Sequence, residues 1–256
     1  MEVILNINDL EYQNIFNKIT LSVEKSKIIT IAGANNCGKT TLSRILDRKI
    51  QDNFNINLLG KDIKDYSLEE YDHLIQVVYP TEGSLEENTP IEELERKEVR
   101  KEKIEFFKKE LKDLKLLEKE VKKISTKEKI WVELLSAIGK AEEIVVIDNI
   151  DYYFSKKELD RIYEFIRSCA KEFLLSFLIM TTSLDHSLLT DTLYILKEGE
   201  IILGGEPLNV LQKDNIINKA GLNVPFMIDL SVKLRDYELI KNVELDKERL
   251  VDTLWN

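Results

Sequence analysis

Residues 28–46 read IITIAGANNCGKTTLSRIL, and they carry the strongest indication of the fold class. Residues 28–32 are apolar and mostly β-branched, which predicts a buried strand, and residues 41–46 have the pattern of a helix. Between them, residues 33–40 match the pattern G-x-x-x-x-G-K-[ST]. A strand, this loop and a helix in succession are the context that a phosphate-binding loop requires. The stretch therefore predicts such a loop within an α/β fold.

The residue types in this loop are suited to binding phosphate and Mg²⁺. Gly33 and Gly38 allow backbone N–H groups to point inward around phosphate oxygens, beside the positive end of the following helix. Lys39 is suited to neutralise the terminal phosphates, and the hydroxyl of Thr40 is suited to bind Mg²⁺. We expect Cys37 to be a small loop residue rather than a redox sensor. The residues expected to bind phosphate are Gly33, Ala34, Asn35, Asn36, Cys37, Gly38, Lys39, Thr40 and Thr41.

A second apolar run, EIVVID at 143–148, ends in Asp148. A continuous apolar run of this length is typical of a parallel strand buried on both faces. We expect the Asp148 carboxylate to hold Mg²⁺ opposite the loop, often through water. Helical spacing over 155–172, with Ser155 as its N-cap, leads to another apolar run at 173–180, which completes a strand, helix, strand unit. Further strands are predicted at 3–7, 19–23, 28–32, 55–59 and 74–79, and a hairpin at 192–205 turning at Gly199.

Composition narrows the class of protein. The chain has 256 residues, a net charge of −10 and two cysteines, which exclude a disulfide framework. The first residues, MEVILNINDL, lack a basic region and a cleavage site, so no secretory signal is expected. The run at 173–180 is far shorter than the roughly 20 residues of a membrane span. The acidic balance disfavours a nucleic-acid partner, because neutralising phosphates supplies most of that affinity.

Two further regions stand apart from the core. Residues 92–123 contain 22 charged positions, yet apolar residues recur there every three to four positions, which predicts a solvated helical arm with one apolar face. The interspersed signs favour a surface role over a nucleic-acid patch. The last forty residues have a turn at Gly221 and Pro225 and a helical pattern from about Leu230. We expect a core at 1–83 and 124–215, the arm at 84–123 and a C-terminal region at 216–256.

Taken together, residues 2–212 resemble the nucleotide-binding domain of ABC transporters. Residues 219–255, with Gly-Leu-Asn-Val-Pro-Phe and a closing Leu-Val-Asp-Thr-Leu-Trp, resemble the extension of the ATPases in energy-coupling-factor importers. The resemblance implies a P-loop NTPase fold with a mixed sheet, a reduced helical subdomain and a small C-terminal extension that helps two ATPases dimerise. It implies ATP and Mg²⁺ as cofactors, and it places Tyr12 as the ring that stacks on adenine; the alternative is an aromatic ring in the core. A second ATPase subunit and a transmembrane coupling component on the cytoplasmic side of the membrane are the implied partners.

The departures from the family pattern gather in the hydrolytic motifs. Pro80 stands where the family has the Q-loop glutamine, and Gln76 lies inside the preceding strand. The signature LSGGQ aligns with residues 124–128, ISTKE, which keep only the serine, although Lys127 can offer a charge. The D-loop aspartate aligns with Ser155.

The two positions that act on water in the family are also changed. Asn149 replaces the catalytic glutamate, and an amide cannot act as a general base. Thr182 replaces the switch histidine. We expect His186 to lie on a helix surface. Asp151 lies too far along the chain from Asp148 to act as the general base. No catalytic residue is convincing, so we expect MgATP binding with weak or absent hydrolysis. The alternatives are an active ATPase that uses non-aligned groups, or a soluble regulatory ABC-type protein.

Overall fold

The computed structural model describes residues 2–81, 85–86 and 88–255. Within them, the larger sheet has six strands in the order β10-β9-β3-β8-β7-β6. All neighbouring strands in it are parallel except the β9–β10 hairpin, so the expected mixed sheet is confirmed. The strands are β3 (Ile28–Ala32), β6 (Ile75–Val78), β7 (Ile144–Asp148), β8 (Ser176–Thr181), β9 (Thr192–Lys197) and β10 (Glu200–Gly205).

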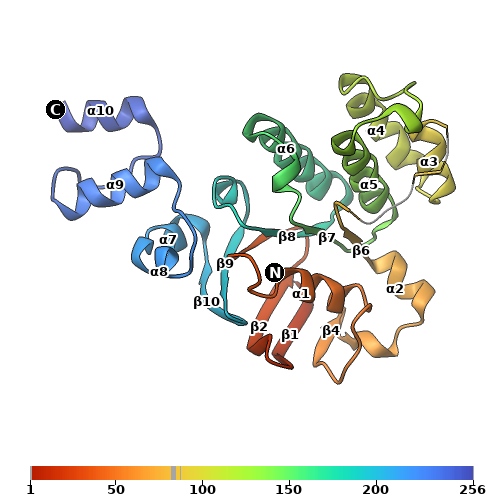
Figure 1. Ribbon diagram of the computed structural model, residues 1–256, viewed down its shortest axis with the longest axis horizontal. Helices are drawn as coiled ribbons and strands as arrows, with labels where there is room; N and C mark the ends of the chain where they lie inside the picture. Colours follow the sequence, from red (N-terminus) through yellow and green to blue (C-terminus); the bar gives the residue numbers. More distant parts are fainter. Residues whose placement is uncertain (1, 82–84, 87, 256) are drawn as a thin grey trace.

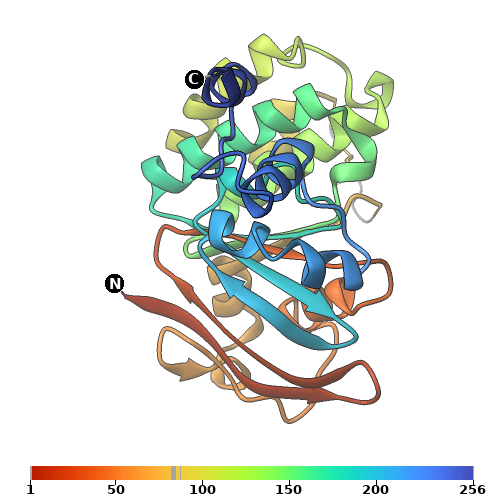
Figure 2. The same ribbon diagram turned by 90° about the vertical axis from the view of Figure 1, so that its left-hand side faces the viewer.

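A smaller antiparallel sheet lies beneath the larger one, with the order β2-β1-β4-β5. Helix α1 (Lys39–Leu46) lies between the two sheets (Figures 1 and 2), and Leu42, Ile45 and Leu46 are fully buried there against both. This apolar face places the start of α1 at the carboxyl end of β3. The other elements of this half are β1 (Val3–Tyr12), β2 (Phe16–Glu24), β4 (Ile56–Leu58), β5 (Lys61–Asp62), η1 (Ile63–Asp65) and α2 (Leu68–Leu74).

Helices cover the opposite face of the larger sheet. Phe107 of α4 packs against Phe165 and Phe173 of α6, with ring centroids 6.0 and 6.1 Å apart. The apolar face predicted for residues 92–123 is therefore confirmed, but two charged residues of that stretch, Glu93 and Lys103, are buried rather than solvated. The elements are α3 (Pro90–Arg96), α4 (Lys101–Asp113), η2 (Val121–Lys123), α5 (Thr126–Lys140), η3 (Asp151–Tyr153) and α6 (Lys156–Phe173). The expected boundary at 83 and 84 lies outside the described residues.

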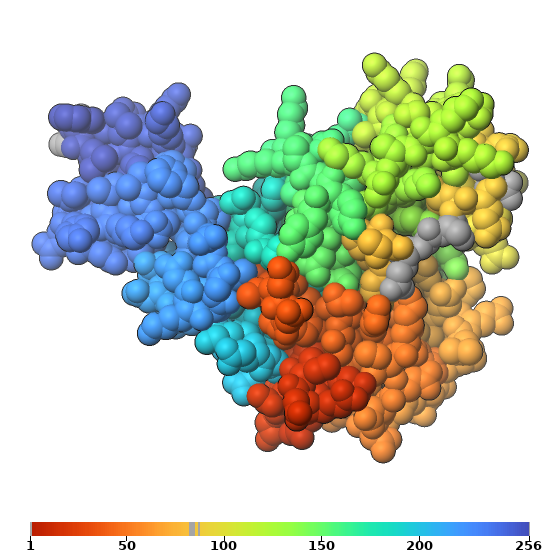
Figure 3. Space-filling view, viewed as in Figure 1, coloured from red at the N-terminus to blue at the C-terminus, as the bar shows by residue number. Residues whose placement is uncertain are grey.

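The C-terminal helices pack around a third apolar cluster, which includes Ile195 of β9 and Ile217, Ile228 and Val232. Figure 3 shows the last of them standing out from the rest of the molecule. The helix expected from about Leu230 begins earlier, at Phe226, directly after Pro225, whose backbone is extended with ψ 135°. The elements are η4 (Ser187–Leu189), α7 (Pro207–Leu211), α8 (Asp214–Lys219), α9 (Phe226–Asp236) and α10 (Lys247–Trp255).

One strand start was also misplaced by the sequence pattern. The run at 173–180 begins inside α6, and β8 starts only at Ser176. Leu174 adopts a left-handed conformation, with φ 56°, that ends the helix between them. No helix in the described part of the chain is both long and apolar enough to span a membrane.

Candidate phosphate-binding site

The loop at 33–38 lies at the carboxyl end of β3, between two neighbouring parallel strands. All five residues of β3 are buried, and β3 pairs with β8 on one side and β9 on the other. The N–H of Gly33 donates to the carbonyl of Thr181 at 3.1 Å, which ties the loop to the end of β8. The predicted order of strand, loop and helix is confirmed.

Two glycines of the loop have no room for a side chain. A Cβ at Gly33 would lie 2.4 Å from both Cys37 Sγ and the carbonyl oxygen of Leu196. Gly38 has φ +112°, which favours glycine, and a Cβ there would lie 2.4 Å from the ring of Phe16. The hairpin that joins β1 to β2 therefore holds the loop in place from outside.

Lys39 lies inside the curve of the loop. Its side chain is buried, and Nζ donates to the carbonyls of Gly33 and Ala34 at 2.7 and 2.9 Å. Nζ also lies 3.7 Å from Cys37 Sγ, and that thiol is itself buried. The ammonium group is therefore held at the loop by neutral acceptors that an anion can replace.

A pocket of ≈ 370 Å³ opens over this loop. It gathers backbone and side-chain donors at the start of α1, where the helix dipole favours an anion. Its lining residues are Ile15, Asn35, Asn36, Gly38, Lys39, Thr40, Thr41 and Asn149. The pocket thus brings together six of the nine residues expected to bind phosphate, and adds Ile15 and Asn149.

Asp148 is the last residue of strand β7, and Asn149, which follows it, lines this pocket. The Asp148 carboxylate is buried and accepts a bond from Asn149 Nδ2 at 3.0 Å. Asn149 Oδ1 is buried and has no hydrogen-bond partner among the described residues. A carboxylate, an orphaned amide oxygen and the Thr40 hydroxyl are the hard oxygen donors that Mg²⁺ prefers, so these residues fit the ion. No cluster of three or more His, Cys, Asp or Glu side chains suited to a metal occurs among the described residues.

Tyr12 lies at the end of β1, in register with Phe16 of β2. Its half-buried ring meets Phe54 edge-on, with centroids 5.7 Å apart. Tyr12 belongs to the same hairpin as Ile15, which lines the phosphate pocket, but Tyr12 itself does not line it. The ring belongs partly to the core and keeps one part exposed.

Gln76, Ser125 and Lys127, which lie in or near the segments aligned with family motifs, do not line the phosphate pocket. Gln76 donates to the side chain of Asp72 at 3.0 Å and does not line the pocket. Ser125 caps α5, so the segment that aligns with the signature is the first turn of a helix. Lys127 pairs with Glu158 at 2.8 Å, and this hydrogen bond lowers the pKa of Glu158 to about 2. The charge that Lys127 was expected to offer is therefore matched within the chain.

Asp151 forms a hydrogen bond with Thr181, the last residue of β8. Its carboxylate accepts a bond from the hydroxyl of Thr181, and burial raises its pKa above the usual range. Next to it, the Tyr152 hydroxyl donates to Asn35 Oδ1 at 3.0 Å and accepts from Thr182 Oγ1 at 3.2 Å. Sequence reasoning missed Tyr152; the signal available was a pair of aromatic residues that begins four positions after Asp148.

The expectation that His186 lies on a helix surface was wrong. His186 is buried, its ring stacks on Tyr163 with centroids 4.9 Å apart, and Nε2 lies 3.0 Å from Asp160. An aromatic ring beneath it and a carboxylate at its edge give it a packing role. It does not line the phosphate pocket.

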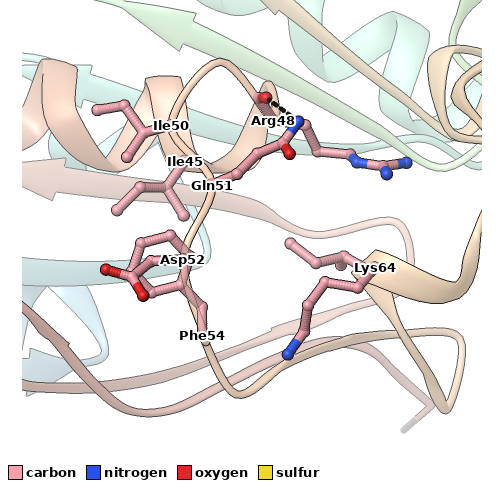
Figure 4. A pocket seen from close by; sticks show the side chains of 8 residues that line it. Ile45, Arg48, Ile50, Gln51, Asp52, Phe54 and Lys64 are labelled. Carbon is pink, nitrogen blue, oxygen red and sulfur yellow. Dashed lines mark hydrogen bonds between the residues drawn. The ribbon is translucent and has the colours of Figure 1, made fainter.

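A second cavity of ≈ 290 Å³ lies near the carboxyl end of α1 (Figure 4). Ile45, Ile50, Phe54 and Ile63 form much of its wall, and the guanidinium of Arg48 donates to the carbonyl of Tyr66. None of the residues expected to bind phosphate or metal lines it.

The sequence model of the family described as ABC transporter matches residues 16–151, which include the loop and Asp148. The chain belongs to the ABC transporter family. This membership agrees with the mixed sheet and with the position of the loop within it.

Similar proteins cover nearly the whole chain. The energy-coupling factor transporter ATP-binding protein EcfA1 of Mycoplasma mobile is 23% identical over 92% of this chain and 88% of its own length. EcfA1 of Bacillus subtilis is 22% identical over 93% and 88%. Among solved structures, cbiO1 from Clostridium perfringens, described as part of the ABC transporter complex cbiONQ, has a TM-score of 0.74 at 19% identity. That comparison covers 92% of this chain and 100% of cbiO1.

Proposed function

We propose that this chain is an ATP-binding subunit of an ABC importer of the energy-coupling-factor type. The observation that carries the proposal is the pocket in which the loop, the start of α1 and the residue after β7 meet; Lys39, Thr40 and Asn149 line it. The relatives that match over nine tenths of the chain, named as energy-coupling factor transporter ATP-binding proteins, support the same function.

In this proposal the loop backbone, Lys39, Thr40 and Thr41 bind the phosphates, and Tyr12 stacks on the base. Thr40 and Asp148 hold Mg²⁺, which supplies charge neutralisation at the phosphates. Lys39 exchanges its bonds to the carbonyls of Gly33 and Ala34 for bonds to phosphate oxygens. Because the whole chain is net acidic, the affinity for an anion comes from this local arrangement.

Hydrolysis in this proposal is slow or absent. Asn149 has no carboxylate to accept a proton from water, and Thr182 has no imidazole. Asp151 does not replace them, because its carboxylate is bonded to Thr181. Loss of a positioned base costs roughly 10² to 10⁴ in rate.

The proposed assembly pairs this chain with a second ATPase beneath a transmembrane component, on the cytoplasmic face of the membrane. The core would span 1–83 and 124–215, the helical arm 84–123 and the dimerisation extension 216–256. Large apolar side chains of that extension are exposed: Phe226 by 74%, Tyr237 by 78% and Trp255 by 85%. These exposed aromatic side chains, at the two ends of α9 and the end of α10, are available for a contact with another chain.

The test of nucleotide binding is calorimetric titration of the purified chain with MgATP, beside a steady-state hydrolysis assay. We expect binding, a loss of at least about tenfold in affinity for Lys39→Ala, and hydrolysis close to background. Lys18→Ala, an exposed lysine on β2, is the matched control and should bind as the wild type does. Absence of binding refutes the proposal. Rapid hydrolysis that Lys39→Ala abolishes would show instead an active ATPase with non-aligned groups.

Assembly is tested by purifying the tagged chain from solubilised membranes. Recovery of a second ATPase with a membrane protein supports the importer. Recovery with ribosomes or DNA and without a membrane component would show a regulatory ABC-type protein.

A further inference from the structure

Three residues from distant segments form a chain of hydrogen bonds beside the phosphate pocket. Thr182 follows the end of β8, Tyr152 lies in η3 after β7, and Asn35 belongs to the phosphate loop. Thr182 Oγ1 donates to the Tyr152 hydroxyl at 3.2 Å, and this hydroxyl donates to Asn35 Oδ1 at 3.0 Å. Asn35 lines the pocket, whereas Tyr152 and Thr182 do not.

The direction of these bonds determines which end of the Asn35 amide faces a ligand. A phenol has one proton, and Tyr152 gives it to Asn35 Oδ1 while its oxygen accepts from Thr182. The acceptor end of the amide is then satisfied by protein, and the NH₂ end is left for the pocket. Phosphate oxygens at such a pocket are acceptors, so they bind the NH₂ end and are repelled by the carbonyl end.

We propose that Tyr152 is a positioning residue that orients Asn35 as a hydrogen-bond donor to the phosphates of the bound nucleotide, with Thr182 fixing the direction of the bonds. The inference rests on the proposed function, since it concerns the same nucleotide. Thr182 occupies the position that aligns with the family's switch histidine. The role proposed for Thr182 needs a hydroxyl and no imidazole.

Because the Tyr152 side chain is largely exposed, a role in positioning Asn35 can be distinguished from a role in stabilising the fold. Its side chain is 64% exposed, so it adds little to the packing of the chain. Removing its hydroxyl should therefore change nucleotide affinity and leave thermal stability unchanged. The neighbouring Tyr153 packs against the helical core and provides a matched control.

The experiment measures the Kd for MgATP and the Tm of Tyr152→Phe, Asn35→Ala, their double variant and Tyr153→Phe. We expect Tyr152→Phe to weaken binding about fivefold, the effect of one net hydrogen bond, with Tm within about 2 °C of the wild type. In the Asn35→Ala background, Tyr152→Phe should cause no further loss, because its target is gone. Thr182→Val should weaken binding in the same direction, and Thr182→Ser should restore it.

Two results overturn the proposal while leaving the proposed function intact. The first is a Tyr152→Phe variant that binds MgATP as tightly as the wild type. The second is an equal loss with and without Asn35. If the wild type itself does not bind MgATP, the proposed function fails and this role fails with it.

Discussion

Lys103 is a lysine buried between α4 and α5, and it makes the stability of the protein depend on pH. Its Nζ donates to the carbonyls of Ile138 and Ala141 at 2.9 and 2.8 Å, at the end of α5. Nζ also lies 5.1 Å from the centre of the Phe173 ring. Burial, followed by repulsion from Arg100, lowers the pKa of Lys103 from 10.5 to about 8.

The sign and size of the effect follow from that shift. Between pH 8 and 10.5 the unfolded chain holds a proton on Lys103 that the folded chain has released. The free energy of unfolding therefore rises with pH over this window, by at most about 1.4 kcal/mol for each pH unit. From pH 8 to pH 10.5 the free energy of unfolding should rise by about 3 kcal/mol because of Lys103.

The assay is urea unfolding at pH 7.5, 8.5, 9.5 and 10.5 of the wild type, Lys103→Met and Lys101→Met. Lys101 is exposed on the same helix and is the matched control. Burial also raises the pKa of Cys169, Tyr71 and Tyr163, which adds to the pH dependence of unfolding, so the quantity to follow is the difference between wild type and variant. For Lys103→Met this difference should shift by about 3 kcal/mol in favour of the wild type as pH rises.

A difference that stays constant from pH 7.5 to 10.5 would refute the reasoning, since it would mean that Lys103 keeps its ordinary pKa. An equal slope for Lys101→Met would refute it too, because burial would then not be the cause.

Two further predictions concern packing. Gly38→Ala should lower the free energy of unfolding by about 2–5 kcal/mol, because it combines φ +112° with a Cβ 2.4 Å from the Phe16 ring. It should also weaken MgATP binding in a calorimetric titration, whereas Gly60→Ala, in a turn with nothing within 4 Å of the added Cβ, should bind normally. Phe107→Ala should cost about 3–5 kcal/mol in urea unfolding because the ring is fully buried. Phe226→Ala, at a side chain 74% exposed, should stay within about 0.5 kcal/mol; equal losses at both positions would contradict the burial argument.

Much of the site could be predicted from sequence because its main part is continuous. Residues 33–41 form one loop between one strand and one helix, and local patterns identify all three. Asp148 could be predicted for the same reason, because it is the last residue of an apolar strand. The hydrogen bond between Tyr152 and Asn35 could not be predicted from the sequence, because the two residues lie 117 positions apart and no local pattern relates them.

From the residues alone one can predict the strand, loop and helix at 28–46, the strand that ends at Asp148, and the residue types at 149 and 182, an amide and a hydroxyl. These depend on residue type and on spacing of a few positions. Tertiary structure alone decided that Lys103 and His186 are buried, although each belongs to a stretch that looks solvated. It also decided that Tyr152 reaches the loop. The physical reason is the same in each case: burial and hydrogen-bond partners are set where distant segments meet, and the energy of a polar group depends on those neighbours.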